Sequence, residues 1–230
     1  MTKKDSKKNA IKKTNYRKRY KNQSLKIPKR LIGKTKMVSL PFCNLIQLDP
    51  GAGTASQQIY RANSVFDPNY TSGAVGHPNH QPRGRDEMFT LYNKATVMGH
   101  KITVTACNDG NAGAVILALS YNQNYSAKLD ILDIVEKDEV NYTVLGPKNA
   151  QPLKTINRNF STTKFFDKKD LVDEEDFTET STTGPALNST AYCHLHCAAL
   201  DYSTDSSAVS ALVRIDYLVM FHDPIELDKS

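Results

Sequence analysis

Apolar and polar residues alternate along most of the chain after residue 37, and turn-forming residues interrupt the alternation. In AVSALVRIDYLVMFH (208–222), the odd-numbered positions from Val209 to Phe221 are apolar. Because strand side chains point alternately to opposite faces, this period of two predicts a strand with one face in a core. Apolar runs or alternation bounded by turn residues predict further strands at 38–48, 57–66, 95–107, 112–121, 142–145, 153–160 and 190–202.

Two of these strands carry more specific expectations. In 95–107 we expect one face to be shared by Met98, Ile102, Val104 and Ala106. The segment 112–121 is apolar almost throughout, which is typical of a strand covered on both faces.

Helical patterns are rare. RDEMFTLYN (85–93) predicts one short helix that closes an end of the sandwich with Met88, Phe89, Leu91 and Tyr92, and 131–140 fits either a second helix or a loop. We therefore predict an all-β protein: a single eight-stranded jelly-roll β-sandwich with long loops, one short helix and a disordered basic N-terminal arm. The long connections 67–94, 123–141 and 161–189 are candidates for interaction surfaces.

The charge of the chain is divided unevenly. Residues 1–38 carry a net charge of +14, whereas the remaining residues carry −8. Residues 1–36 have low hydrophobicity and no strand or helix period, which predicts disorder in isolation. We divide the chain into a nucleic-acid-binding arm (1–36) and a jelly-roll domain (37–230). The predicted nucleic-acid-binding residues are Lys3, Lys4, Lys7, Lys8, Lys12, Lys13, Tyr16, Arg17, Lys18, Arg19, Tyr20, Lys21, Lys26, Lys29, Arg30, Lys34 and Lys36.

Phosphate groups are the partner that this density of cations fits best. Tyr16 and Tyr20 could each stack on a nucleobase without sequence preference. The same charge fits a nuclear localisation signal, and a merely solvated segment is the alternative.

A resemblance to a known family enters at residues 61–102. Here the chain reads ANSVFDP (62–68), then HQPRG (80–84), a short helix with aromatic residues, and VMGHKI (97–102). This order resembles the capsid proteins of circular Rep-encoding single-stranded DNA viruses, the circovirus-like group, and the terminal VRIDYLVMFHDP (213–224) is similar to their last strand. The chain departs from the family in its Lys-rich arm, in Arg85 at a position that is often aromatic or apolar, and in its lack of Trp.

The resemblance implies a function and partners. It implies a coat protein that associates with about sixty copies of itself in a small icosahedral shell. It also implies a packaged circular single-stranded DNA genome, host nuclear import receptors as partners, an unknown cell-surface attachment factor, and a location in the virion and the host nucleus. The alternatives are a cellular nucleic-acid-binding protein with a basic tail and a carbohydrate-binding jelly roll. DNA and RNA cannot be told apart from the residues.

Two clusters invite a metal-binding interpretation. In CHLHC (193–197), strand alternation would place both histidines opposite the two cysteines, so the four side chains cannot converge on one zinc ion. We expect buried cysteines and hydrogen-bonded histidines instead. The acidic stretch 167–179 lacks EF-hand spacing and is interpreted as a solvated loop, with a weak ion site or an acidic contact surface as alternatives.

Enzyme signatures are also missing from the sequence. It contains no phosphate-binding P-loop, no nucleophile elbow and no nickase arrangement of histidines and tyrosine. We expect a non-enzyme without cofactor or metal. The first residues resemble no secretory signal, so we expect the four cysteines to be free thiols in a reducing compartment.

Overall fold

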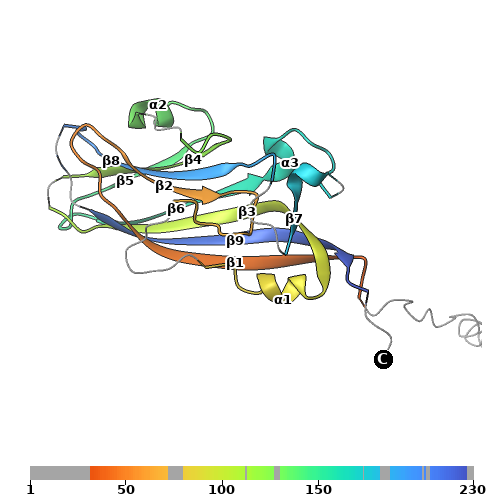
Figure 1. The fold of residues 1–230 in the computed structure, drawn as a ribbon. Helices are drawn as coiled ribbons and strands as arrows, with labels where there is room; N and C mark the ends of the chain where they lie inside the picture. Colours follow the sequence, from red (N-terminus) through yellow and green to blue (C-terminus); the bar gives the residue numbers. More distant parts are fainter. Residues whose placement is uncertain are drawn as a thin grey trace, which may run out of the picture. The chain divides into compact units, whose positions relative to one another are not determined.

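The computed structural model describes residues 32–71, 80–111, 113–126, 130–172, 174–181, 187–203, 205 and 208–226. The described strands form two facing antiparallel sheets (Figure 1). In the first sheet the order is β1 (Thr35–Leu48), β9 (Val209–Pro224), β3 (Tyr92–Asn108) and β6 (Leu153–Ser161), and the short β7 (Thr178–Thr180) also pairs with β3. In the second sheet the order is β2 (Ser56–Arg61), β8 (Tyr192–Ala199), β4 (Val115–Asn122) and β5 (Asn141–Leu145).

The pairing of these strands is nested. With β7 set aside, β1 pairs with β9, β2 with β8, β3 with β6, and β4 with β5, all antiparallel. A long hairpin whose tip is β4–β5 has thus been folded over, and the fold is closed by the further pairs β9–β3 and β8–β4. This is the connectivity of a jelly roll, so the predicted fold class is confirmed.

Strand β9 supplies the centre of the core. Its apolar stripe from Val209 to Phe221 is buried at every odd position, as the alternation predicted. Ile215 lies between Phe42 of β1 and Ile102 of β3 in register, and all three are at most 2% exposed. Burial of such side chains contributes roughly 1.5–3 kcal/mol each.

One expectation about β3 is wrong. Met98 is half-buried rather than part of the inward stripe, because the register with β9 shifts between Val97 and Gly99. Met98 is the extra residue at this bulge. Before the bulge the odd-numbered residues Ala95 and Val97 face the core, and after it the even-numbered residues from His100 onward do so. Strict alternation cannot foresee such an insertion.

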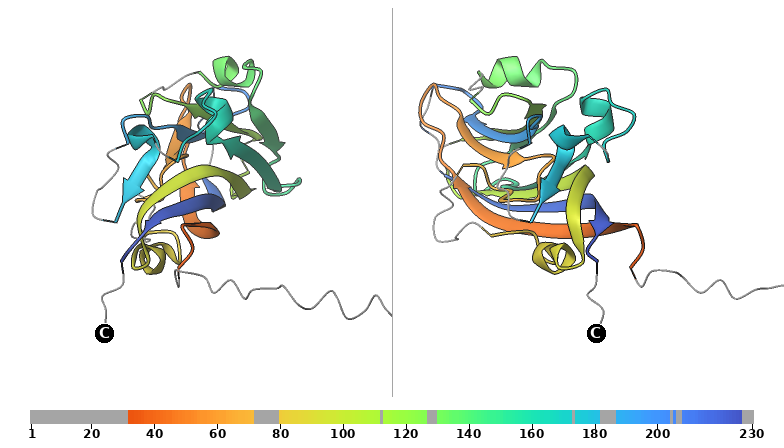
Figure 2. Two further views of the ribbon diagram at one scale, coloured as in Figure 1. Left: turned by 90° about the vertical axis from the view of Figure 1, so that its right-hand side faces the viewer. Right: turned by 45° about the vertical axis from the view of Figure 1, so that its right-hand side comes forward.

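The outer face of the second sheet is covered by α2 (Ile131–Val135). Its buried residues Ile131 and Ile134 pack on Ile116 and Ala118 of β4 and on Ala198 of β8. The expectation of a strand covered on both faces is therefore confirmed for β4. Figures 1 and 2 show α2 above this sheet, and the choice between helix and loop at 131–140 is settled as a short helix followed by a turn.

Helix α1 (Arg85–Phe89) is shorter than predicted. The rings of Phe89 and Tyr92 lie 5.4 and 6.2 Å from the ring of Phe221, so these two residues do close one end of the core. Leu91, in contrast, is 40% exposed and takes no part in the closure. Strand β2 also ends earlier than expected, at Arg61.

The sequence analysis missed three short elements, namely α3 (Thr162–Phe165), a 3-10 turn (Glu175–Phe177) and β7. All three lie in the long connection 161–189, and none is longer than four residues. Periodicity needs longer segments than these to be recognised. Among the described residues, no helix is long and apolar enough to cross a membrane.

Gly99 tests the packing at the bulge. A Cβ atom there would lie 2.4 Å from the backbone oxygen of Phe160, so Gly99→Ala forces β3 and β6 apart. We expect the substitution to lower the free energy of unfolding by about 1–3 kcal/mol in urea denaturation. Gly33→Ala is the control, because the nearest heavy atom to its added Cβ would be 3.5 Å away. Equal stability of the two variants would contradict this packing.

Candidate nucleic-acid and assembly sites

The predicted nucleic-acid-binding residues divide into two groups. The fifteen from Lys3 to Arg30 lie outside the described residues. Lys34 and Lys36 are exposed where β1 begins. The chain is held at this point by a hydrogen bond that the Tyr92 hydroxyl donates to the carbonyl oxygen of Gly33, at 3.2 Å.

The structure adds one cation to this group. Thr35 of β1 and Lys94 of β3 both lie opposite His222 of β9, so Lys94 is at the same end of the first sheet as Lys34 and Lys36. Lys94 is exposed. Sequence reasoning missed it, because only strand pairing brings it to the start of β1.

The segment after β2 covers the free edge of that strand. The amide of Arg61 donates to the oxygen of Pro68 at 2.8 Å, and the amide of Tyr70 donates to the oxygen of Ile59 at 3.0 Å. The ANSVFDP segment therefore turns back and satisfies the backbone groups of β2. This supports the structural interpretation of the motif.

The HQPRG segment does the same for β1. The amide of Arg83 donates to the oxygen of Pro41 at 3.0 Å, and Nε2 of His80 lies 2.9 Å from the oxygen of Cys43. Gly84 then adopts a φ of 88° as α1 begins, a conformation that glycine adopts without strain. The edge of β1 is thus covered by a loop from within the same chain.

Glu179 of β7 holds the first part of the motif in place. Its two carboxylate oxygens accept from the amide of Val65, at 3.1 and 3.3 Å, and its side chain is almost fully buried. Burial raises the pKa of this carboxyl above its usual value, while hydrogen bonds and the charge of Arg85 oppose that shift. The acidic stretch therefore contributes one residue to the interior, which its sequence spacing did not reveal.

Arg85 occupies a position where the resembled family often has an aromatic or apolar residue. Its guanidinium lies over the rings of Phe66 and Phe89, 5.3 and 4.7 Å from their centroids, and Nη1 is 2.7 Å from an oxygen of Asp86. The side chain is buried. Cation–π contacts and the charge of the nearby Glu179 stabilise the guanidinium, while its Nε and Nη2 atoms have no hydrogen-bond partner among the described residues.

The CHLHC stretch is arranged as the alternation predicted. Cys193 and Cys197 face the core, and His194 and His196 face the outer side of the second sheet. The two imidazoles are stacked, with centroids 5.7 Å apart and planes 7° apart. The described residues contain no group of three or more potential ligands that could hold a metal ion.

Both outer histidines are buried in surroundings that disfavour charge. Burial lowers the pKa of His194 to about 4 and that of His196 to about 3, and the charge of Lys137 lowers both pKa values further. The side-chain amide of Gln57 bonds with Nδ1 of His194, and Nε2 of His196 lies 3.2 Å from the Ser120 hydroxyl. Nε2 of His194 has no hydrogen-bond partner among the described residues, so the expectation of hydrogen-bonded histidines is met only in part.

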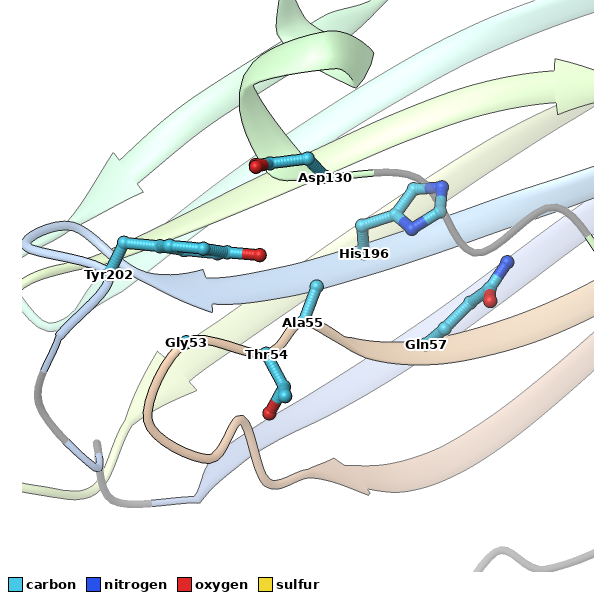
Figure 3. A pocket seen from close by; sticks show the side chains of 7 residues that line it. All are labelled: Gly53, Thr54, Ala55, Gln57, Asp130, His196 and Tyr202. Carbon is cyan, nitrogen blue, oxygen red and sulfur yellow. The ribbon is translucent and has the colours of Figure 1, made fainter.

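A pocket of about 280 Å³ opens beside His196 (Figure 3). Four separate segments of the chain form it, and its lining residues are Gly53, Thr54, Ala55, Gln57, Asp130, His196 and Tyr202. Asp130 Oδ1 accepts from the amide of Leu132 and caps α2. The polar groups can form hydrogen bonds with a small molecule. Sequence reasoning missed this pocket, because no short motif joins the four segments.

The remaining acids of 167–179 are dispersed at the surface. Glu174 forms an ion pair with Lys168 at 3.1 Å, and Asp176 accepts from the side chain of Asn188 at 2.9 Å. Asp173 lies outside the described residues. Asp167, Asp170 and Glu175 are exposed, as a solvated loop predicts, whereas the buried Glu179 is not part of such a loop.

Comparisons with known proteins give distant structural likenesses only. No family model and no curated protein matches the sequence. A chain of tobacco necrosis virus is similar in structure, with 14% identity, coverage of 85% of each chain and a TM-score of 0.47. A chain of mud crab tombus-like virus has 9% identity, coverage of 88% of this chain and 96% of that chain, and a TM-score of 0.45. A chain of Desmodium yellow mottle tymovirus has 13% identity, coverage of 89% and 97%, and a TM-score of 0.41.

The strand order of the two sheets identifies the fold as a jelly roll. The resemblance to circovirus-like capsid proteins stays a prediction.

Glu179 provides a test of the motif's structural role. Glu179→Ala leaves the buried amide of Val65 without an acceptor, so we expect the free energy of unfolding to fall by about 1–3 kcal/mol. Glu179→Gln keeps one acceptor oxygen and should lose less. Glu175→Ala, at a nearby acid outside this hydrogen bond, is the control for urea denaturation. A Glu179→Ala protein as stable as the control would show that the carboxylate does not hold the motif.

The histidine pair predicts a pH dependence. A lowered pKa in the folded state means that the unfolded chain binds more protons, so this contribution to stability is complete above about pH 6.5 and is lost as the pH falls toward 4. Between these two pH values, each histidine lowers the free energy of unfolding by about 1.4 kcal/mol for every unit that the pH falls. The free energy of unfolding, measured by urea denaturation, should fall less steeply from pH 7 to pH 5 in the His194→Gln/His196→Gln double variant than in wild type. A double variant whose free energy of unfolding depends on pH as steeply as that of wild type would refute the assignment.

Proposed function

We propose that this chain is a viral capsid protein that assembles into a small icosahedral shell of about sixty copies and packages circular single-stranded DNA through residues 1–36. The observation that carries the proposal is the division of charge between a +14 segment and a −8 remainder that folds as a jelly roll. A negative body limits its own attraction to nucleic acid, so binding is directed to the arm. The motif resemblance supports the same function.

The position of the first described cations fits this proposal. Lys34, Lys36 and Lys94 lie at the end of the first sheet where β1 begins, with Lys94 on the opposite face of the sheet from Lys36. The contact between Tyr92 and Gly33 fixes where the chain leaves the jelly roll. DNA bound to the arm would therefore be held at this end of every subunit.

The positive charge of the arm also fits a role in nuclear import. Clusters of Lys and Arg such as Arg17, Lys18 and Arg19 are the pattern that nuclear import receptors bind. We therefore place the protein in the virion and, during assembly, in the host nucleus, with import receptors as transient partners.

The salt dependence of DNA binding tests this function. If about ten arm cations contact single-stranded phosphates, the slope of log K against log salt concentration should be roughly −7. Replacing the arm's Lys and Arg from Lys3 to Arg30 by Gln in the full chain should bring the slope close to zero and abolish DNA packaging. Replacing the body residues Lys101, Lys154 and Lys164 by Gln is the control. DNA binding by the arm variant with an unchanged slope would overturn the proposal, as would packaging at the wild-type level.

A further inference from the structure

The edge strands on the two sides of the sandwich differ in whether a loop of the same chain contacts them. On one side β1 and β2 are the edge strands, and each is covered by a loop, as described above. On the other side the edge strands are β5 and β6, which lie near each other and are linked by a bond from the Asn141 side chain to the oxygen of Asn157, at 2.7 Å. Within the described part of the chain, β5 pairs with β4 alone. The described residues therefore leave its outer edge without a strand partner.

The side chains of β5 are also unusually apolar for an exposed edge. Tyr142 is 56% exposed and Val144 is 38% exposed. They lie opposite Ala118 and Ile116 of β4, whose side chains are covered by α2. Tyr142 and Val144 thus continue an apolar outer face beyond the limit of its cover. Proteins commonly protect such edges with charge, proline or a covering segment.

We propose that two copies of this chain associate by antiparallel pairing of their β5 strands across a two-fold axis at Thr143. This inference rests on the proposed function, because a shell requires self-association, and it names the surface that performs one of the contacts. Pairing at the edge satisfies the backbone donors and acceptors that face away from β4. A two-fold axis lets one strand serve as its own partner.

The sequence of β5 is suited to this symmetry. With Thr143 on the axis, Tyr142 faces Val144 of the partner subunit, and Val144 faces Tyr142 of the partner subunit. Aromatic and β-branched residues form favourable cross-strand pairs, each contributing roughly 0.2–1 kcal/mol relative to alanine.

The charges next to β5 favour the same orientation. The exposed residues that precede the strand are three acids and one base, namely Glu136, Lys137, Asp138 and Glu139, and Glu139 forms an ion pair with Arg158 of β6 at 3.5 Å. The exposed Lys148 follows the strand. Antiparallel pairing brings the acidic beginning of one strand toward the basic end of the other, whereas parallel pairing would bring like charges together. The apolar Leu45 and Leu212 are comparably exposed and provide controls, because Leu45 lies in β1, whose edge the HQPRG loop contacts, and Leu212 lies opposite it in the interior strand β9.

A cysteine at the axis tests the geometry directly. Directly opposite Cα atoms in antiparallel strands are about 4.5–5.5 Å apart, within the range that a disulfide spans. The full chain with Thr143→Cys, in a Cys43→Ser background that removes the exposed native thiol, should form a covalent dimer on mild oxidation. The matched control is Leu45→Cys in the same background, which should remain monomeric on a non-reducing gel. Absence of a Thr143→Cys dimer under conditions in which wild type assembles would overturn the inference.

A charged residue placed in β5 tests whether the edge of this strand is needed for assembly. Val144→Lys places an ammonium group in the apolar contact, so we expect at least about a tenfold loss of large particles by mass photometry. Leu45→Lys should assemble like wild type, and circular dichroism should show both variants folded. Normal assembly of Val144→Lys would also overturn the inference.

The failure of this inference can be distinguished from failure of the proposed function. A wild-type chain that forms no large particles but whose Thr143→Cys variant forms a dimer would support the β5 contact and contradict the shell. A wild-type chain that forms particles while both edge variants behave like their controls would leave the shell intact and remove the contact.

Discussion

Pairing of β9 with both β1 and β3 is the constraint on which the rest of the structure depends. It joins the last described strand to the first and buries the seven apolar residues at the odd positions from Val209 to Phe221. Because the pairs are nested, fixing this outermost pair also determines which strands meet at each edge: β1 and β2 on one side, β5 and β6 on the other. The covered edges and the edge of β5 that lacks a partner among the described strands follow from that order.

Much of this architecture could be predicted from the sequence, because strand periodicity is a local signal. The eight long strands, the stripe on β9 and the opposite faces of the CHLHC residues were predicted and are confirmed. Met98 was placed wrongly because a bulge is set by the partner strand. The interior position of Glu179 and the open edge of β5 depend on contacts between distant segments, which no local pattern records.

The sequence motifs serve the fold rather than chemistry. ANSVFDP and HQPRG bend back onto β2 and β1 and satisfy their backbone groups, while Glu179 and Arg85 hold these turns against the core. Covering one side of the sandwich in this way directs strand-mediated association to the other side. A polycationic segment that precedes β1 in the chain and a self-association contact at β5 would assign the two proposed functions, nucleic-acid binding and self-association, to different segments.

The proposed shell around nucleic acid can be tested by analytical ultracentrifugation of the purified full-length protein after nuclease treatment, with absorbance recorded for protein and nucleic acid together. We expect megadalton particles that carry nuclease-protected single-stranded DNA. A single species near 25.6 kDa that is free of nucleic acid at low and at physiological salt would contradict it.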